Sequence, residues 1–208
     1  MRETLSLLNI LEGYIRNYRK LNLFQATNKS MYTKREISYF ETVGEYLGFF
    51  SFIEDTKPNY DYGRSRPMDL SWWKWDERVS SEVFSNLVLH LERENYFLKD
   101  LETIDKLFCK TDENYTPDYV IGIINVKSKA RIEELQKEVL KRNKVQKSEV
   151  LMIYRFYDKI KDYDRIEAYY CSSDLRTKVK REAISDIDDT GYWMMCYKEE
   201  YKNNSRQL

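Results

Sequence analysis

The sequence predicts an α/β protein with a mixed central sheet flanked by helices. Short apolar segments typical of strands alternate with longer segments of helical periodicity along most of the 208 residues. A helical segment at 98–110 separates strand segments at 85–94 and 118–126, which favours a parallel crossover between those two strands. The shorter connections between the earlier strands favour antiparallel neighbours. The two kinds of connection together predict a mixed sheet.

The first 48 residues are expected to form two helices joined by a polar loop. Apolar residues recur near helical spacing at 3–21 and again at 34–48, whereas residues 22–33 are polar. The apolar positions with this spacing are Leu5, Leu8, Leu11 and Ile15 in the first helix and Ile37, Phe40 and Leu47 in the second.

The remaining elements follow one another without an internal repeat or a low-complexity linker. Strands are expected at 49–53, 68–75, 85–94, 118–126, 149–157, 165–171 and 191–197, and helices at 98–110, 128–144 and 174–187. Residues 54–65 are expected to form a loop because they are rich in Pro, Gly, Asn and Asp. We divide the chain into an N-terminal helical extension at 1–33, an α/β domain at 34–197 and a polar tail at 198–208.

Cysteine usage indicates a reducing compartment. The three cysteines, Cys109, Cys171 and Cys196, are odd in number and far apart, which fits neither a disulfide framework nor a metal-ligand spacing. The N-terminus carries no cleavage pattern of a signal peptide, and no run reaches the roughly 18 apolar residues of a membrane span. We therefore expect a cytoplasmic protein that does not enter a membrane.

Charges are balanced overall but segregated along the chain. The formal net charge is zero, so no global field favours nucleic acid. Residues 14–35 nevertheless hold six basic and no acidic side chains, and residues 92–118 hold eight acidic against four basic ones. Basic flanks around an acidic centre suit a polyanion bound at a metal site, although solvated helix faces would give the same pattern.

An acidic group on two neighbouring strands is the most informative feature. Alternation along 86–94 places His90, Glu92 and Glu94 on one face and Arg93 on the other. Asp69 lies in the segment MDLSWW, which is otherwise suited to burial, and an ionised Asp there needs a partner. If the two strands are neighbours, Asp69 and Glu92 meet on one face, where a hard cation such as Mg²⁺ would relieve their repulsion.

This arrangement resembles the PD-(D/E)xK, or restriction-endonuclease-like, nucleases. Their core runs helix, three strands, helix, strand, with an Asp on the second strand and a (D/E)-x-K motif on the third. Here RPMD at 66–69 stands for the first motif, with its Pro two residues before the acid, and LERE at 91–94 stands for the second. The resemblance covers roughly residues 34–126 and is a D…ExE variant of the pattern.

The resemblance implies a nuclease that hydrolyses phosphodiester bonds, with DNA as the expected substrate. Asp69 and Glu92 would bind Mg²⁺ or Mn²⁺, and Glu41 on the preceding helix would support the metal. Glu94 takes the place of the family's usual Lys and would activate or orient water. Some members carry the Lys on the following helix instead, where Lys106 is the candidate.

Other interpretations remain open at this point. Asp69 could be a structural carboxylate paired with a nearby Arg or Lys, and Lys106 could form a helix-surface ion pair with Glu102. His90 could orient a phosphate or be a hydrogen-bonded core residue. The whole fold could serve as a non-catalytic module that binds nucleic acid, a protein or a second copy of the chain. The Trp-rich segment at 72–75 could then supply an exposed ring.

No sequence feature supports nucleophilic Ser or Cys chemistry. The chain has no Gly-x-Ser-x-Gly motif, no Gly-rich phosphate loop and a single histidine. These absences leave the carboxylates as the main candidates for chemistry.

Overall fold

An eight-stranded mixed sheet forms the centre of the structure, a computed structural model that describes residues 4–26, 28–54, 68–75, 84, 86–110, 114–188 and 190–201. The strands lie in the sheet in the order in which they occur along the chain. They are β1 (Phe50–Ile53), β2 (Leu70–Lys74), β3 (Asn86–Glu94), β4 (Tyr119–Asn125), β5 (Glu149–Asp158), β6 (Tyr163–Cys171), β7 (Lys178–Ile187) and β8 (Trp193–Tyr197).

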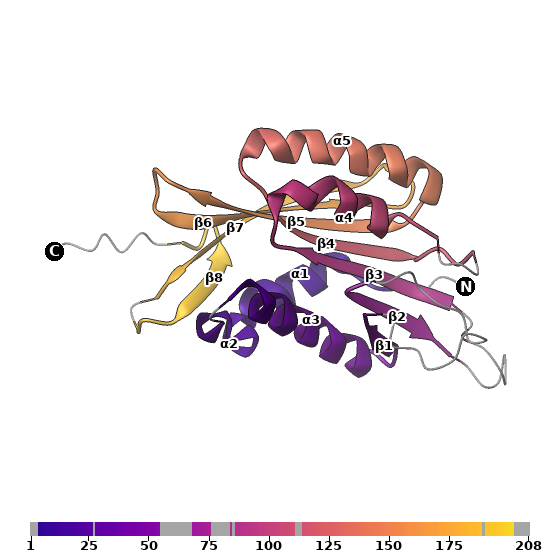
Figure 1. Cartoon of the computed structure of the whole chain (residues 1–208), viewed down its shortest axis with the longest axis horizontal. Helices are drawn as coiled ribbons and strands as arrows, with labels where there is room; N and C mark the ends of the chain where they lie inside the picture. The colour runs from indigo at the N-terminus through magenta and orange to yellow at the C-terminus, as the bar shows by residue number, and fades with distance from the viewer. Residues whose placement is uncertain are drawn as a thin grey trace.

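Helices cover both faces of this sheet. Figure 1 shows α1, α2 and α3 on one side and α4 and α5 on the other. Their bounds are α1 (Leu7–Arg16), α2 (Tyr18–Leu21), α3 (Lys29–Tyr46), α4 (Asp100–Leu107) and α5 (Lys129–Gln146), with short 3-10 turns η1 (Leu23–Gln25) and η3 (Phe97–Lys99). The predicted α/β class, with a mixed sheet flanked by helices, is confirmed.

The type of strand pairing changes twice across the sheet. Strands β1, β2 and β3 are antiparallel, β3, β4 and β5 are parallel, and β5 to β8 are antiparallel again. The parallel steps are the two that contain a crossover helix, α4 or α5, as parallel pairing requires. From α3 to β4 the order is therefore helix, three strands, helix, strand, as the sequence predicts.

The two faces of the sheet bury separate cores. Leu89, Leu91 and Ile121 belong to a cluster shared with α1 and α3, whereas Val120 and Ile124 belong to a cluster shared with α4 and α5. Neighbouring residues of a strand thus point to opposite helical layers, as the pleat dictates. Each fully buried aliphatic side chain contributes about 1.5–3 kcal/mol, so both layers hold the middle strands firmly.

Helix ends agree with their sequence signals. The Asn28 side chain accepts from the amide of Met31 at the start of α3, and the Ser128 side chain accepts from the amide of Arg131 at the start of α5. Helix α5 ends at Gln146 and is capped by Lys147, whose positive φ of 62° closes the last turn.

Three local predictions were wrong. The expected helix at 174–187 is strand β7, because its backbone pairs with β6 on one side and β8 on the other, and this pairing overrides its weak helical pattern. The expected single helix at 3–21 is interrupted at Asn17, which ends α1. The expected loop at 22–33 contains η1 and the first turns of α3, which begins directly after the Asn28 cap. Most of the loop expected at 54–65 lies outside the described residues.

None of the helices in the described part of the chain combines the length and the apolar character needed to cross a membrane.

Candidate functional site

Strands β2 and β3 bring Asp69 and Glu92 together. Leu70 pairs with Leu91, and the same register places Asp69, one residue before β2, opposite Glu92. The backbone amide of Asp69 donates to Glu92 Oε1 at 3.2 Å, and the amide of Arg93 donates to Asp69 Oδ2 at 2.7 Å. Each carboxylate therefore takes a backbone N–H at the end of the strand ladder, which fixes both side chains in place.

Helix α4 adds Lys106 to this pair. Its Nζ lies 3.5 Å from Glu92 Oε2, and its side chain is 44% exposed whereas that of Glu92 is 5% exposed. The ion pair thus joins an accessible ammonium group to a buried carboxylate. The structure favours this contact over the alternative of a simple surface pair between Lys106 and Glu102.

Gly122 allows α4 to lie close to the sheet at this point. It is the cross-strand neighbour of Glu92 on β4. A Cβ atom at Gly122 would lie 2.4 Å from Met152 Cε and 2.9 Å from Leu107 Cδ1, both closer than real Cβ contacts. Because Gly122 has no side chain, Leu107 and the neighbouring Lys106 can lie close to β3 and β4.

Burial and mutual repulsion raise the pKa values of both carboxyls. The pKa of Glu92 is raised to about 8, first by burial and then by the charge of Asp69, while Lys106 acts in the opposite direction. The pKa of Asp69 is also raised, mainly by burial, although the Arg93 amide and Lys106 oppose the rise. The pair is therefore short of positive charge, and a bound cation would stabilise both ionised forms.

Glu94 lies at the rim of the pair. It ends β3, is partly exposed, and accepts a hydrogen bond from the amide of Tyr96 at 2.6 Å. Its charge, like that of Glu54 directly after β1, contributes to the raised pKa of Asp69. Glu94 therefore adds negative field to the site, while the backbone of the next turn orients its carboxylate.

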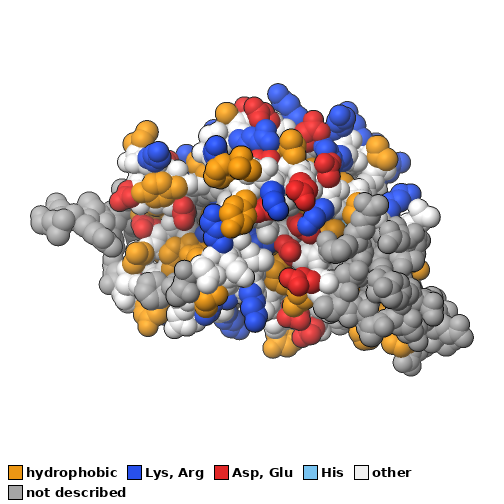
Figure 2. Space-filling model, viewed as in Figure 1, with side chains coloured by type: hydrophobic (Ala, Val, Ile, Leu, Met, Phe, Trp, Pro, Cys, Tyr) orange, Lys and Arg blue, Asp and Glu red, His pale blue; other side chains and the backbone are white. Residues whose placement is uncertain are grey.

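The surface around the sheet combines both signs of charge. In Figure 2, Asp and Glu side chains form a group near the lower centre of the displayed face, with Lys and Arg side chains above it and to its left.

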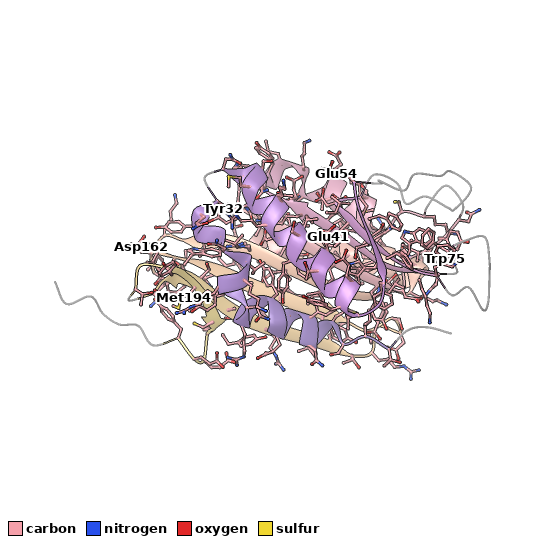
Figure 3. All side chains as sticks on the ribbon, turned by 90° about the horizontal axis from the view of Figure 1, so that it is seen from below. Tyr32, Glu41, Glu54, Trp75, Asp162 and Met194 are labelled. Atoms are coloured by element: carbon pink, nitrogen blue, oxygen red, sulfur yellow. The ribbon has the colours of Figure 1, made fainter. Side chains whose placement is uncertain are left out.

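Glu41 does not join the group, which corrects the prediction that it supports a metal there. It lies on α3 (Figure 3), the helix that packs on the sheet face carrying Leu91 and Arg93, whereas Glu92 faces α4. Partial burial and the charge of Glu45 raise the pKa of Glu41 within its own helix. Among the described residues, no set of three His, Cys, Asp or Glu side chains is gathered as a metal-binding group.

His90, Trp72 and Trp73 belong to the interior. His90 is fully buried opposite Ser71. Trp72 stacks on Phe49, and Trp73 lies in a second aromatic cluster with its ring 5.1 Å from that of Tyr115. The two buried rings are consistent with the core interpretation, whereas Trp75, directly after β2, is half-buried and packs against Phe84.

A buried ion network on the opposite face was not foreseen. The carboxylate of Glu36 on α3 binds Arg93, accepts from Arg155 Nη1 at 3.1 Å and accepts from the Tyr14 hydroxyl at 2.6 Å. Burial alone would raise the pKa of Glu36, but the two guanidinium charges outweigh it and hold the pKa below its ordinary value. The signal in the sequence was an Arg on the apolar face of each of two strands, after Leu89 and Leu91 in β3 and after Leu151 and Ile153 in β5.

Comparisons with known proteins give no family for this chain. No family model and no curated protein matches it. Among solved structures, the central domain of yeast acetyl-CoA carboxylase is similar with a TM-score of 0.30 and 10% identity, over 42% of this chain and 14% of that one. The matched part is a small fraction of the carboxylase.

Proposed function

We propose that this protein is a metal-dependent nuclease that hydrolyses phosphodiester bonds, with DNA as the substrate. The observation that carries the proposal is the Asp69–Glu92 pair with Lys106 against it. Three side chains from β2, β3 and α4 converge at one strand end, although they are far apart in the sequence.

The two carboxylates fit a hard divalent cation. Mg²⁺ is commonly held by one or two carboxylates and keeps further positions for water and phosphate oxygens. Asp69 and Glu92 are such a pair, and their raised pKa values mark a deficit of positive charge that Mg²⁺ or Mn²⁺ would supply. When bound, the cation would lower the pKa of its water and polarise a phosphoryl oxygen.

Lys106 can donate hydrogen bonds in the proposed site, which an ionised Glu94 cannot. An ammonium group can donate to a water or to a phosphate oxygen, whereas an ionised carboxylate only accepts. Lys106 is accessible and lies within 3.5 Å of Glu92. In the proposed site it orients the attacking water beside the carboxylates, and Glu94 accepts a proton or hydrogen bond at the rim.

The element order and the surface charges add support. The succession helix, three strands, helix, strand is that of the nuclease core which the motifs resemble. The acidic group on the surface has basic side chains beside it, which suits a polyanion whose reactive phosphate lies at a cation. The proposal also keeps the cytoplasm as the location, an expectation that rests on cysteine usage.

The experiment is a cleavage assay on single- and double-stranded DNA and RNA. Reactions with Mg²⁺, with Mn²⁺ and with EDTA are compared for the wild type, Asp69→Asn and Glu92→Gln. Cutting that requires a divalent cation and disappears in both variants supports the site. Metal-dependent cutting that survives both substitutions places the chemistry elsewhere.

A second candidate function is a non-catalytic module that binds a protein, which includes a second copy of this chain. An exposed apolar group around η3 favours it: Tyr96, Phe97, Leu98 and Leu101 are 57%, 40%, 83% and 41% exposed. Neighbouring exposed apolar side chains often mark an interaction surface. Absence of cutting on every substrate, together with self-association that Leu98→Ser abolishes, would favour this module.

A further inference from the structure

A cavity of about 350 Å³ opens at the carboxyl ends of the parallel strands β3, β4 and β5. Asn95 follows β3, Asn125 ends β4 and Arg155 lies on β5, while Lys29 contributes from the first turn of α3. Ligands of open α/β sheets bind at the carboxyl ends of parallel strands, where loops leave space. The cavity also has the size of a small-molecule pocket.

Arg155 presents unused donors to this cavity. Its guanidinium group lies 4.8 Å above the Trp193 ring, and the side chain is 6% exposed. Within the described part of the chain its hydrogen bonds reach one partner, Glu36, through Nη1. A guanidinium group has five N–H donors, so Nε and Nη2 remain available to a ligand.

The cavity carries an excess of positive charge. Glu36 supplies one negative charge against both Arg93 and Arg155. Lys29 lies 4.2 Å above the Tyr96 ring and makes no ion pair with any residue that the structure describes. Among the described residues that line the cavity, Asp164 is the single acidic one. The local balance therefore favours an anionic group of compact size.

Asn125 and the aromatic side chains that line the cavity further restrict the kind of ligand that fits it. Asn125 Oδ1 is buried and has no hydrogen-bond partner among the described residues, so it can accept from a hydroxyl group of a ligand. Tyr32, Phe97 and Phe156 line the cavity and offer flat apolar surface for a planar ring. In Figure 3, Tyr32 lies towards one end of α3, well separated along the helix from Glu41.

From these features we infer that the cavity holds one nucleotide unit, with its phosphate on Arg155 and Lys29, a sugar hydroxyl at Asn125 and the base against the aromatic side chains. The site uses none of the residues of the Asp69–Glu92 pair. It therefore stands whether or not the chain cuts DNA, and its test needs no divalent cation.

Calorimetric titration of the full chain in EDTA tests the inference. The probes are deoxyadenosine monophosphate, deoxyadenosine without phosphate, and a short single strand of DNA with either a phosphate or a hydroxyl at its 5′ end. We expect the monophosphate to bind at least about 10-fold more tightly than the nucleoside, because charge-assisted hydrogen bonds to the phosphate are lost in the latter.

Two lysine variants on α3 provide a matched comparison. Lys29→Met removes a cation of the cavity and is expected to weaken binding of the monophosphate about 10-fold without changing binding of the nucleoside. Lys34→Met removes a cation from the same helix that lies in a different groove, so it should leave both affinities unchanged. Arg155→Lys, checked by thermal melting for a folded state, should weaken the monophosphate at least as much as Lys29→Met.

The strand probes distinguish the source of the nucleotide. Tighter binding of the 5′-phosphorylated strand than of the monophosphate assigns the cavity to a strand end, and binding of the monophosphate alone assigns it to a free nucleotide. Both outcomes support the inference. Equal affinity for nucleoside and monophosphate, no saturable binding of the monophosphate, or an unchanged affinity in Lys29→Met would overturn it.

Discussion

Asp69 and Glu92 hold each other through the backbone. The Asp69 amide donates to the Glu92 carboxylate at 3.2 Å, while the Asp69 carboxylate accepts the amide of Arg93, the residue after Glu92, at 2.7 Å. These two hydrogen bonds keep two like-charged side chains close together in a mostly buried position. This arrangement explains why the pKa of Glu92 rises to about 8, with burial as the main cause and the Asp69 charge as the second.

The raised pKa of Glu92 predicts that stability falls as the pH rises. Its carboxyl ionises near pH 4.5 in the unfolded chain and near pH 8 in the folded one. Between these values the folded state binds more protons, so the free energy of unfolding should decrease with increasing pH in EDTA, by at most about 1.4 kcal/mol per pH unit from this group. Urea unfolding at several pH values from about 5 to 8 measures the slope.

Glu92→Gln is the matched variant for this slope, since it keeps the shape and removes the titration. The variant should show a flatter dependence of the unfolding free energy on pH than the wild type. Identical slopes in the two proteins would contradict the account of Glu92.

A divalent cation should stabilise the folded protein through the same two carboxylates. A cation that binds the folded state and not the unfolded chain raises the melting temperature by mass action. Because protons compete for Glu92, the increase with Mn²⁺ should be larger at about pH 8 than at about pH 6. It should vanish in Asp69→Asn and persist in Glu102→Gln, which changes an exposed carboxylate on α4. An equal increase in Asp69→Asn would locate the cation elsewhere.

Gly122→Ala should destabilise the protein and displace α4. Its Cβ would meet Met152 Cε and Leu107 Cδ1 at 2.4 and 2.9 Å, and overpacking of this kind costs about 1–3 kcal/mol. Because Leu107 is next to Lys106, the substitution should also reduce activity more than its loss of stability explains. Unfolding measurements and cleavage rates on the same variant provide the two readouts.

Shortening Met152 should relieve the strain. The double variant Gly122→Ala with Met152→Val is expected to recover part of the unfolding free energy, which a double-mutant cycle quantifies. Strictly additive effects of the two substitutions would show that the predicted contact does not form.

Glu36→Gln should be strongly destabilising at neutral pH. It leaves two buried guanidinium groups without a counter-charge, and breaking a buried ion pair costs about 3–5 kcal/mol. The pKa of Glu36 is lowered in the folded state, so this contribution is present at neutral pH and is lost as the pH falls through the folded pKa. The difference in unfolding free energy between variant and wild type should therefore shrink in acid.

Tyr14→Phe is the mild companion, since it removes one hydrogen bond to Glu36 and should cost about 1–1.5 kcal/mol. If Glu36→Gln lowered the free energy of unfolding by less than Tyr14→Phe does, this ranking would be refuted.

Local rules predicted much of the fold and of the site. The alternation of β3 correctly separated Glu92 and Glu94 from Arg93, because the pleat of a strand depends on local geometry alone. The meeting of Asp69 and Glu92 followed from assuming that two consecutive strands are neighbours, which holds here. The element order from α3 to β4 was predicted because each of these segments carries its own local periodicity.

The failures depend on tertiary contacts. Strand β7 is a charged segment whose structure is decided by its backbone pairing with β6 and β8. The spacing of its apolar residues does not predict that pairing. Glu41 was assigned by resemblance, but the packing of α3 places it across the sheet from Glu92. The partners of Arg93 and Arg155 come from α3, more than fifty residues away in the sequence. Such distant pairings need the folded structure.

The most direct test of the central claim is the cleavage rate of Glu92→Gln relative to the wild type and to Glu102→Gln, on DNA with Mn²⁺. The account predicts metal-dependent cutting by the wild type and by Glu102→Gln, a loss of at least about 100-fold in Glu92→Gln, and a loss of similar size in Lys106→Met. Cutting by Glu92→Gln at the wild-type rate would contradict the account.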